Sequence, residues 1–281
     1  MNGGIFVVQQ KQLYKEAMNV LKATSRTFFI PITFLEKDMK TTVATAYLCM
    51  RAIDEIEDHE DITVEEKARM LTKTAELLST QPFDNAAYLA EIDAYKSILP
   101  EVTLRLNDWL TLCPDAIRQR VAASTGEMAG GMAKWALKGW VCHTKEDLDD
   151  YTYYVAGLVG VMLSDIWKTF ANIDTDRDLA IGYGRGLQAV NILRNQDEDA
   201  ERGVSFVPDG WTRDELFAYA NNNLEKAEAY NKQITKRSIL MFCKIPLALA
   251  HKTLKTMHSG NEKLTRAEVE ATVAELDEHT K

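Results

Sequence analysis

The stretch DEIED at residues 54–58 decides the fold, because it predicts two acidic side chains on one face of a helix. A second stretch, NQDED at residues 195–199, repeats the four-residue step and begins with Asn instead of Asp. Residues four apart lie one helical turn from each other, so each stretch presents a pair of oxygen-bearing side chains. Oxygen pairs that face each other across a helical bundle suit Mg²⁺, a hard ion that bridges carboxylates and phosphates.

The residues that precede the first pair distinguish it from an ordinary solvated face. Further acids surround Asp54 and Asp58, so an exposed acidic face is the plain alternative. Residues 47–53, however, are mostly apolar, which indicates a helix that is buried until the acids begin. Arg51 lies three residues before Asp54, near the same face. A guanidinium and two carboxylates in one line indicate an anion held by metal and arginine together.

The second pair belongs to a longer polar stripe. Residues 186–199 read GLQAVNILRNQDED, in which Gln188 and Asn191 share the face of Asn195 and Asp199. The opposite side of this predicted helix is apolar. A polar stripe usually faces solvent, but neutral amides among the acids are more typical of a lined cavity.

Two further segments combine groups of interest. The segment SRTF at residues 25–28 precedes a predicted helix. It fits either a helix cap or a diphosphate cradle of hydroxyl, guanidinium and backbone N–H groups. The segment YTYYVAGLVG at residues 151–160 places aromatic side chains before small ones. Core packing is its plain explanation, although the glycines also let a flat ligand or another helix come close.

Length and composition set the bounds. The chain has 281 residues, of which 46% are hydrophobic and 27% charged, as in an ordinary globular protein. The net charge of −9 argues against a nucleic-acid partner. The four cysteines are scattered without metal-site spacing and fit a reduced, cytosolic context. No apolar run is long enough to cross a bilayer, and no secretory signal is evident.

The whole chain reads as helices, which predicts a single all-α bundle over residues 1–281. Thr63 and Thr144 are predicted N-caps, since acidic residues follow them. We expect an irregular loop over residues 201–211, beside a functional site. Prolines mark the connections, at Pro82, Pro100, Pro114 and Pro208.

Taken together, these segments resemble the squalene/phytoene synthase family, the head-to-head prenyl synthases. The resemblance runs from about residue 20 to residue 255 and is strongest in four blocks that follow the family order. These blocks are residues 25–28, 47–58, 151–160 and 186–208. Two segments resemble squalene synthases more than plant-type phytoene synthases. They are RAID at residues 51–54 and YVAGLVG at residues 154–160. The resemblance implies an isoprenoid synthase-type all-α fold with one central cavity.

The resemblance also implies roles for single residues. The implied metal-binding positions are Asp54, Asp58, Asn195 and Asp199, with Asn195 where the family usually has Asp. The implied catalytic positions are Tyr151, which matches the tyrosine implicated in proton handling, and Arg51, Asp54 and Asp58. The implied substrate-binding positions are Ser25, Arg26, Phe28, Tyr47, Arg51, Val155, Gln188, Asn191, Arg194 and Arg202.

The implied activity is Mg²⁺-dependent coupling of farnesyl diphosphate, or a similar prenyl diphosphate, to squalene or dehydrosqualene. In this reaction, cations stabilise the negative charge that develops on the leaving diphosphate. The remaining prenyl carbocation forms in a cavity that excludes water. Asn195 offers a carbonyl oxygen without a charge, so hydrolysis to farnesol is an alternative. A non-catalytic relative that acts in binding or assembly is another, but the retained metal and diphosphate residues argue against it.

Use of NADPH stays open, since no glycine-rich dinucleotide fingerprint occurs. Eukaryotic squalene synthases add a C-terminal membrane anchor, whereas this chain ends in the charged residues 262–281. We therefore expect a cytoplasmic monomer or weak dimer without an anchor. Apolar residues at 5–8 offer peripheral membrane contact, although packing on the bundle is the plainer expectation.

Overall fold

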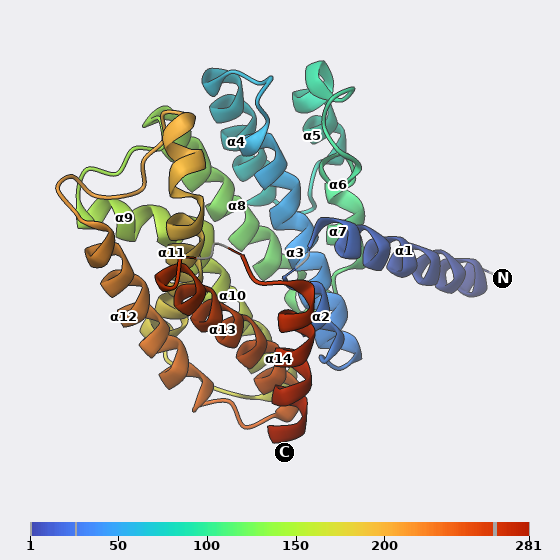
Figure 1. The fold of residues 1–281 in the computed structure, drawn as a ribbon. Helices are drawn as coiled ribbons and strands as arrows, with labels where there is room; N and C mark the ends of the chain where they lie inside the picture. The colour runs from blue at the N-terminus through green and yellow to red at the C-terminus, as the bar shows by residue number, and fades with distance from the viewer. Residues whose placement is uncertain (1, 26, 261–262, 281) are drawn as a thin grey trace. The chain divides into compact units, whose positions relative to one another are not determined.

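The computed structural model describes residues 2–25, 27–260 and 263–280, with the backbone alone for residues 2–6. Helices make up nearly all regular structure in these ranges, which confirms the all-α prediction (Figure 1). Within the same ranges, β pairing is limited to an isolated parallel bridge between Val141 and Ser205. The helices form two compact units. Unit one is Met1–Ile32 with Glu36–Lys138, and unit two is Thr33–Leu35 with Gly139–Lys281.

Unit one is built around α3 (Lys37–Asp58), the helix that carries the first acidic pair. It packs against α1, α4, α6, α7 and α8, so most of its length is buried. The other helices of this unit are α1 (Asn2–Thr24), α2 (Phe29–Thr33, whose last residue falls in unit two), α4 (Val64–Leu78), α5 (Asn85–Ile92), η1 (Asp93–Tyr95), α6 (Glu101–Leu104), α7 (Leu106–Leu112) and α8 (Asp115–Leu137).

Unit two is built around α11 (Arg177–Glu201), the helix of the second pair, which packs against α9, η2, α10, α12 and α13. The remaining elements are α9 (Lys145–Thr152), the π-helical turn η2 (Tyr153–Gly157), α10 (Leu158–Ala171), α12 (Arg213–Asn231), α13 (Arg237–His258) and α14 (Arg266–His279). The irregular segment between α11 and α12 confirms the loop predicted over residues 201–211.

Local sequence signals set several helix ends. The side chain of Thr63 accepts a hydrogen bond from the backbone N–H of Glu66, and Thr144 forms a capping box with Asp147. Both predicted caps are confirmed. The four prolines predicted to mark connections lie outside the helices, at Pro82, Pro100, Pro114 and Pro208.

Glycines bring α11 into backbone contact with the segment before it. A Cβ atom on Gly160 would lie 2.2 Å from the carbonyl oxygen of Ala180. A Cβ on Gly184 would lie 2.2 Å from the carbonyl oxygen of Ala156. Neither position has room for a side chain. The close approach of another helix, one of the two uses predicted for the glycines in 151–160, is therefore confirmed at Gly160.

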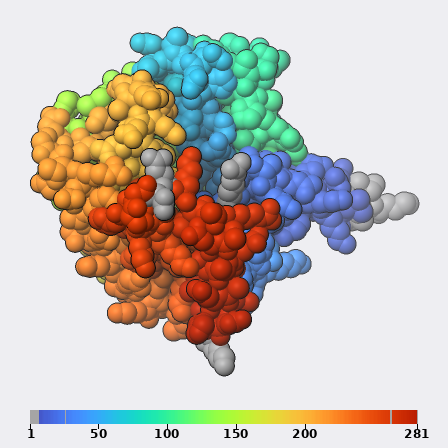
Figure 2. Space-filling view, in the orientation of Figure 1, coloured from blue at the N-terminus to red at the C-terminus, as the bar shows by residue number. Residues whose placement is uncertain are grey.

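The N-terminal apolar residues are exposed where their side chains are described. Val7 and Val8 are 51% and 66% exposed on α1, which extends at the edge of unit one (Figure 2). Packing on the bundle is therefore wrong for these two. Ile5 and Phe6 lie outside the described side chains, and peripheral membrane contact stays a prediction. No helix within the described ranges has the length and apolar character that crossing a membrane requires.

Candidate active site

Three carboxylates gather at the C-terminal end of α3. One carboxylate oxygen from each of Asp54, Glu57 and Asp58 lies within 4.8 Å of the other two. Glu57 is only 6% exposed, which is unusual for an acid. Hard carboxylate oxygens in this number fit Mg²⁺. The four-residue step identified two of the three acids but missed Glu57. Its spacing of three from Asp54 was the available signal.

Arg51 pairs with this acidic end, as its spacing predicts. Its Nη1 lies 2.7 Å from Oδ2 of Asp54, and its Nη2 pairs with Glu55. The Nε atom of Arg51 is buried without a hydrogen-bond partner. Burial and the nearby charge of Asp58 raise the pKa of Asp54 to about 7, although Arg51 opposes the shift. The cluster therefore holds more negative charge than one guanidinium compensates.

The segment before α2 lies near the middle of α3. The ring of Phe28 lies 6.3 Å from that of Tyr47, centroid to centroid. The hydroxyl of Tyr47 donates to the carbonyl oxygen of Thr24. The buried Ser25 hydroxyl oxygen accepts a hydrogen bond from the Phe28 N–H at 3.0 Å, which is the capping contact expected of this segment. Arg26 lies outside the described residues. A diphosphate cradle here stays a prediction.

Three residues of the predicted polar stripe of α11, Gln188, Asn191 and Asn195, are joined by hydrogen bonds in which Arg194 also takes part. The side-chain amide Nδ2 of Asn191 donates to Oε1 of Gln188 at 3.5 Å, and Nη2 of Arg194 donates to the side-chain Oδ1 of Asn191 at 3.1 Å. Nε of Arg194 also donates to the side-chain Oδ1 of Asn195 at 3.4 Å. Gln188, Asn191 and Asn195 are half-buried, consistent with side chains that line a space.

The second pair differs from the first in its charge. Asp199 is 6% exposed, and its Oδ1 accepts a hydrogen bond from Nη2 of Arg202 at 2.5 Å. Asn195 adds an amide oxygen but no charge. Among the described side chains, the clustering of three possible ligands seen on α3 is not repeated on α11. The α11 pair therefore offers a metal fewer anionic oxygens.

A cavity of about 290 Å³ lies between α11 and the loop that follows it. Asp199 and Gln196 form part of its wall, together with the apolar side chains of Ile192, Val204 and Phe206. Asp199 thus lies beside a cavity with both polar and apolar walls.

Tyr151 is packed against the same loop. Its ring stacks on that of Phe206, with centroids 4.2 Å apart and planes inclined by 17°. Tyr151 is only 7% exposed. Val155 lies within η2, and π-helical turns occur frequently at functional sites. Sequence reasoning missed Phe206, because this residue is far from Tyr151 in the sequence and no local pattern indicates their contact.

The predicted site residues that the structure describes are divided between the two units. In unit one they are Ser25, Phe28, Tyr47, Arg51, Asp54 and Asp58. In unit two they are Tyr151, Val155, Gln188, Asn191, Arg194, Asn195, Asp199 and Arg202.

Solved structures define the class of the fold. TcSQS in complex with the ligand E5700 superposes with a TM-score of 0.77 at 24% identity, over 93% of this chain and 85% of that chain. A dehydrosqualene synthase with a ligand gives a TM-score of 0.60 at 19% identity, over 96% and 97% of the two chains. The fold is therefore the all-α isoprenoid synthase type.

The sequence identifies the family within this class. The profile of the family described as squalene/phytoene synthase matches residues 21–216, and the chain belongs to this family. The squalene synthase of Eremothecium gossypii is 28% identical over 91% of this chain and 64% of its own length. Squalene synthase BSS of Botryococcus braunii is 32% identical over 76% of this chain and 46% of its own length. The squalene synthase of Homo sapiens is 27% identical over 88% of this chain and 64% of its own length. This chain thus spans less than two thirds of the length of these relatives.

Proposed function

We propose that this protein is a Mg²⁺-dependent prenyl synthase that ionises farnesyl diphosphate, or a similar prenyl diphosphate, and couples two prenyl chains head to head. The expected product is squalene or dehydrosqualene. One observation carries the proposal: three carboxylates and Arg51 gather at the end of a helix whose preceding turns are buried. Membership of the squalene/phytoene synthase family supports the same chemistry.

Unit one contains both metal ligands and hydrogen-bond donors of the kinds that bind the diphosphate group of a prenyl diphosphate together with Mg²⁺. Asp54, Glu57 and Asp58 would hold Mg²⁺, which when bound supplies positive charge to the leaving diphosphate. A cation bound to Asp54 would compete with Arg51 for that carboxylate. Arg51 would then donate its N–H groups to a phosphate oxygen, as guanidinium groups commonly do. Ser25 and Arg26 are proposed to add donors, and Phe28 and Tyr47 to line the prenyl chain.

The residues of unit two are proposed to act on the same substrates. Asn195 and Asp199 would hold a further ion, surrounded by the amides and guanidinium groups of Gln188, Asn191, Arg194 and Arg202. Tyr151 is proposed to handle a proton, with Val155 beside the prenyl chain. We propose that both units act as one isoprenoid synthase domain over residues 1–281. Replacing Asp58 and Asp199 by Asn, singly and together, tests this. Strongly non-additive losses of kcat/KM would support a shared substrate, and independent losses would contradict it.

Hydrolysis of the diphosphate to a prenyl alcohol is the second candidate function. It is favoured by Asn195, which leaves the α11 pair with one carboxylate. Coupling requires accurate placement of a second chain, whereas water attacks from many directions. A weakly held metal therefore harms coupling more than hydrolysis.

The decisive experiment is product identification. The protein is incubated with farnesyl diphosphate and Mg²⁺, with and without NADPH. We expect diphosphate release with a C30 hydrocarbon, squalene forming where NADPH is used and dehydrosqualene where it is not. Farnesol alone would select the second function. Asp54→Ala and Asp58→Ala should each lower turnover by orders of magnitude in a folded protein. Full activity in EDTA, or in either variant, would overturn the metal assignment.

A further inference from the structure

We propose that Arg185 is a positioning residue, which fixes the junction between α9 and η2 and thereby the placement of Tyr151 and Val155. The proposal rests on the proposed function, because that function gives these two residues their part in the reaction. Arg185 itself is not placed among the substrate-binding residues.

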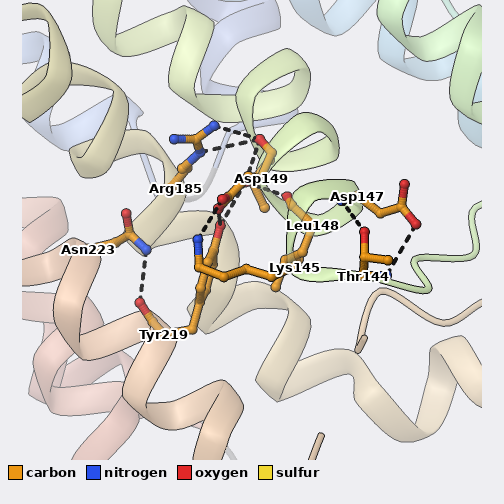
Figure 3. Close-up of polar contacts among 9 residues, drawn as sticks. Thr144, Lys145, Asp147, Leu148, Asp149, Arg185, Tyr219 and Asn223 are labelled. Carbon is orange, nitrogen blue, oxygen red and sulfur yellow. Dashed lines mark hydrogen bonds and ion pairs between the residues drawn. The ribbon is translucent and has the colours of Figure 1, made fainter. Parts of the chain in front are cut away.

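The contact is a double hydrogen bond from a side chain to the main chain. Arg185, on α11, donates from Nη2 at 2.7 Å and from Nε at 3.3 Å to the carbonyl oxygen of Asp149 (Figure 3). The N–H of Tyr153 bonds to the same oxygen, directly where α9 gives way to η2. The C-terminal carbonyls of a helix carry a partial negative charge, so a guanidinium there is stabilising.

The side chain of Asp149 is held by two other donors. The hydroxyl of Tyr219, on α12, donates to Oδ1 at 2.7 Å, and Nζ of Lys145 lies 2.7 Å from Oδ2 (Figure 3). Burial alone would raise the pKa of Asp149. The hydrogen bonds from Lys145 and Tyr219 and the charge of Arg185 outweigh it and lower the pKa. The carboxylate is thus tied to α9 and α12, and the carbonyl is tied to α11 by Arg185.

The junction matters because the turn that follows it is unusual. A π-helical turn is wider than an α-helical turn, so it changes the direction in which later side chains point. Tyr151 lies two residues after Asp149, and Val155 lies inside the turn. The neighbour of Arg185, Gly184, contacts the carbonyl of Ala156 near the other end of η2. Adjacent residues of α11 therefore contact both ends of the segment that carries these two side chains.

The experiment compares Arg185→Met with Lys145→Met. Both remove one cationic partner of Asp149, but only the first removes the contact with the carbonyl at the junction. Amide hydrogen exchange is measured on peptides spanning residues 149–158, with peptides of α13 as internal reference. We expect about tenfold faster exchange in Arg185→Met, a smaller increase in Arg185→Lys, and a change below about twofold in Lys145→Met.

The enzymatic arm uses farnesyl diphosphate and Mg²⁺. Arg185→Met should lower kcat for C30 product about tenfold, with KM changed less than about twofold, and Arg185→Lys should recover part of the loss. Equal exchange in the Met variants of Arg185 and Lys145 would overturn the proposal. Faster exchange with unchanged kcat would also overturn it, since the junction would then not position reacting groups. A wild type without any turnover would refute the proposed function instead, and the exchange arm would still decide whether Arg185 holds the junction.

Discussion

Phe206 stacks face to face on Tyr151, with ring centroids 4.2 Å apart, and thereby joins the loop after the second acidic pair to the end of α9. The same loop is tied to the segment before α9 by the bridge between Val141 and Ser205. The hydrogen bond from Cys142 N–H to the carbonyl of Ser205, at 2.8 Å, strengthens this link. The position of Tyr151 therefore depends on the loop that follows the last turn of α11, the turn that contains Asp199.

This stacking predicts a specific effect of Phe206→Leu. The variant keeps an apolar side chain but loses the ring that packs on Tyr151, and such aromatic pairs contribute about 0.5–1.5 kcal/mol beyond burial. We expect a lower ratio of C30 hydrocarbon to farnesol, because a displaced Tyr151 would be less suited to the proton handling proposed for it and water would enter more easily. Product analysis checks this. Phe83→Leu removes a ring from unit one and should leave the ratio unchanged. An unchanged ratio in Phe206→Leu would contradict the role of the stack.

The acidic cluster predicts a trade between stability and metal binding. The raised pKa of Asp54 means that its ionisation costs free energy in the folded metal-free protein, even with Arg51 beside it. This penalty grows as the pH rises from the unfolded pKa through about 7. Asp54→Asn should therefore raise the melting temperature at pH 8 without metal, and it should remove the stabilisation by added Mg²⁺ that we expect for wild type. Thermal unfolding with Mg²⁺ or EDTA measures both effects.

The control for this trade is Asp61→Asn, which removes an exposed acid just beyond the cluster. It should leave the stabilisation by Mg²⁺ as in wild type. Equal stabilisation of Asp54→Asn and wild type would show that Mg²⁺ binds elsewhere.

Asn195→Asp should restore a charge to the α11 pair. The added carboxylate should lower the Mg²⁺ concentration for half-maximal rate and raise the ratio of C30 product to farnesol. Asp197→Asn, which changes charge on a different face of α11, serves as control. If wild type already makes only C30 product and Asn195→Asp alters neither quantity, the amide is an equivalent ligand and the hydrolase function should be dropped.

Asp149 predicts an acid-dependent loss of stability. Its pKa is lowered in the folded protein, so its contribution is complete above the unfolded pKa of about 3.9 and is lost as the pH falls through the folded value. Asp149→Asn should lower the free energy of unfolding by about 1–2 kcal/mol at pH 6. This difference should shrink toward pH 3. Denaturant titrations at several pH values measure it, and a constant difference would contradict the ionic origin.

The fold followed from signals that lie close together in the sequence. Thr144 and its acidic first turn predict the cap of α9, and the four-residue step predicts that Asp54 and Asp58 share a face. The rest depends on contacts between distant segments. Phe206 has no local feature that points to Tyr151, and the burial of Glu57 depends on the helices around α3. Propensity alone would end a helix near Pro246, yet α13 continues through it.

The close approach of Gly184 to the Ala156 carbonyl has a consequence for how this protein can change. The backbones of α11 and η2 are in direct contact here. Their separation cannot be changed by a shorter or longer side chain, because no side chain lies between them. Substitutions elsewhere on α11 can change the size and polarity of the cavity beside this helix. They do not change the distance between α11 and η2 at the glycine contact. Under the proposed function, substitutions of Ile192 and Val204, which line the cavity beside α11, can therefore change which prenyl chain fits without changing the glycine contact.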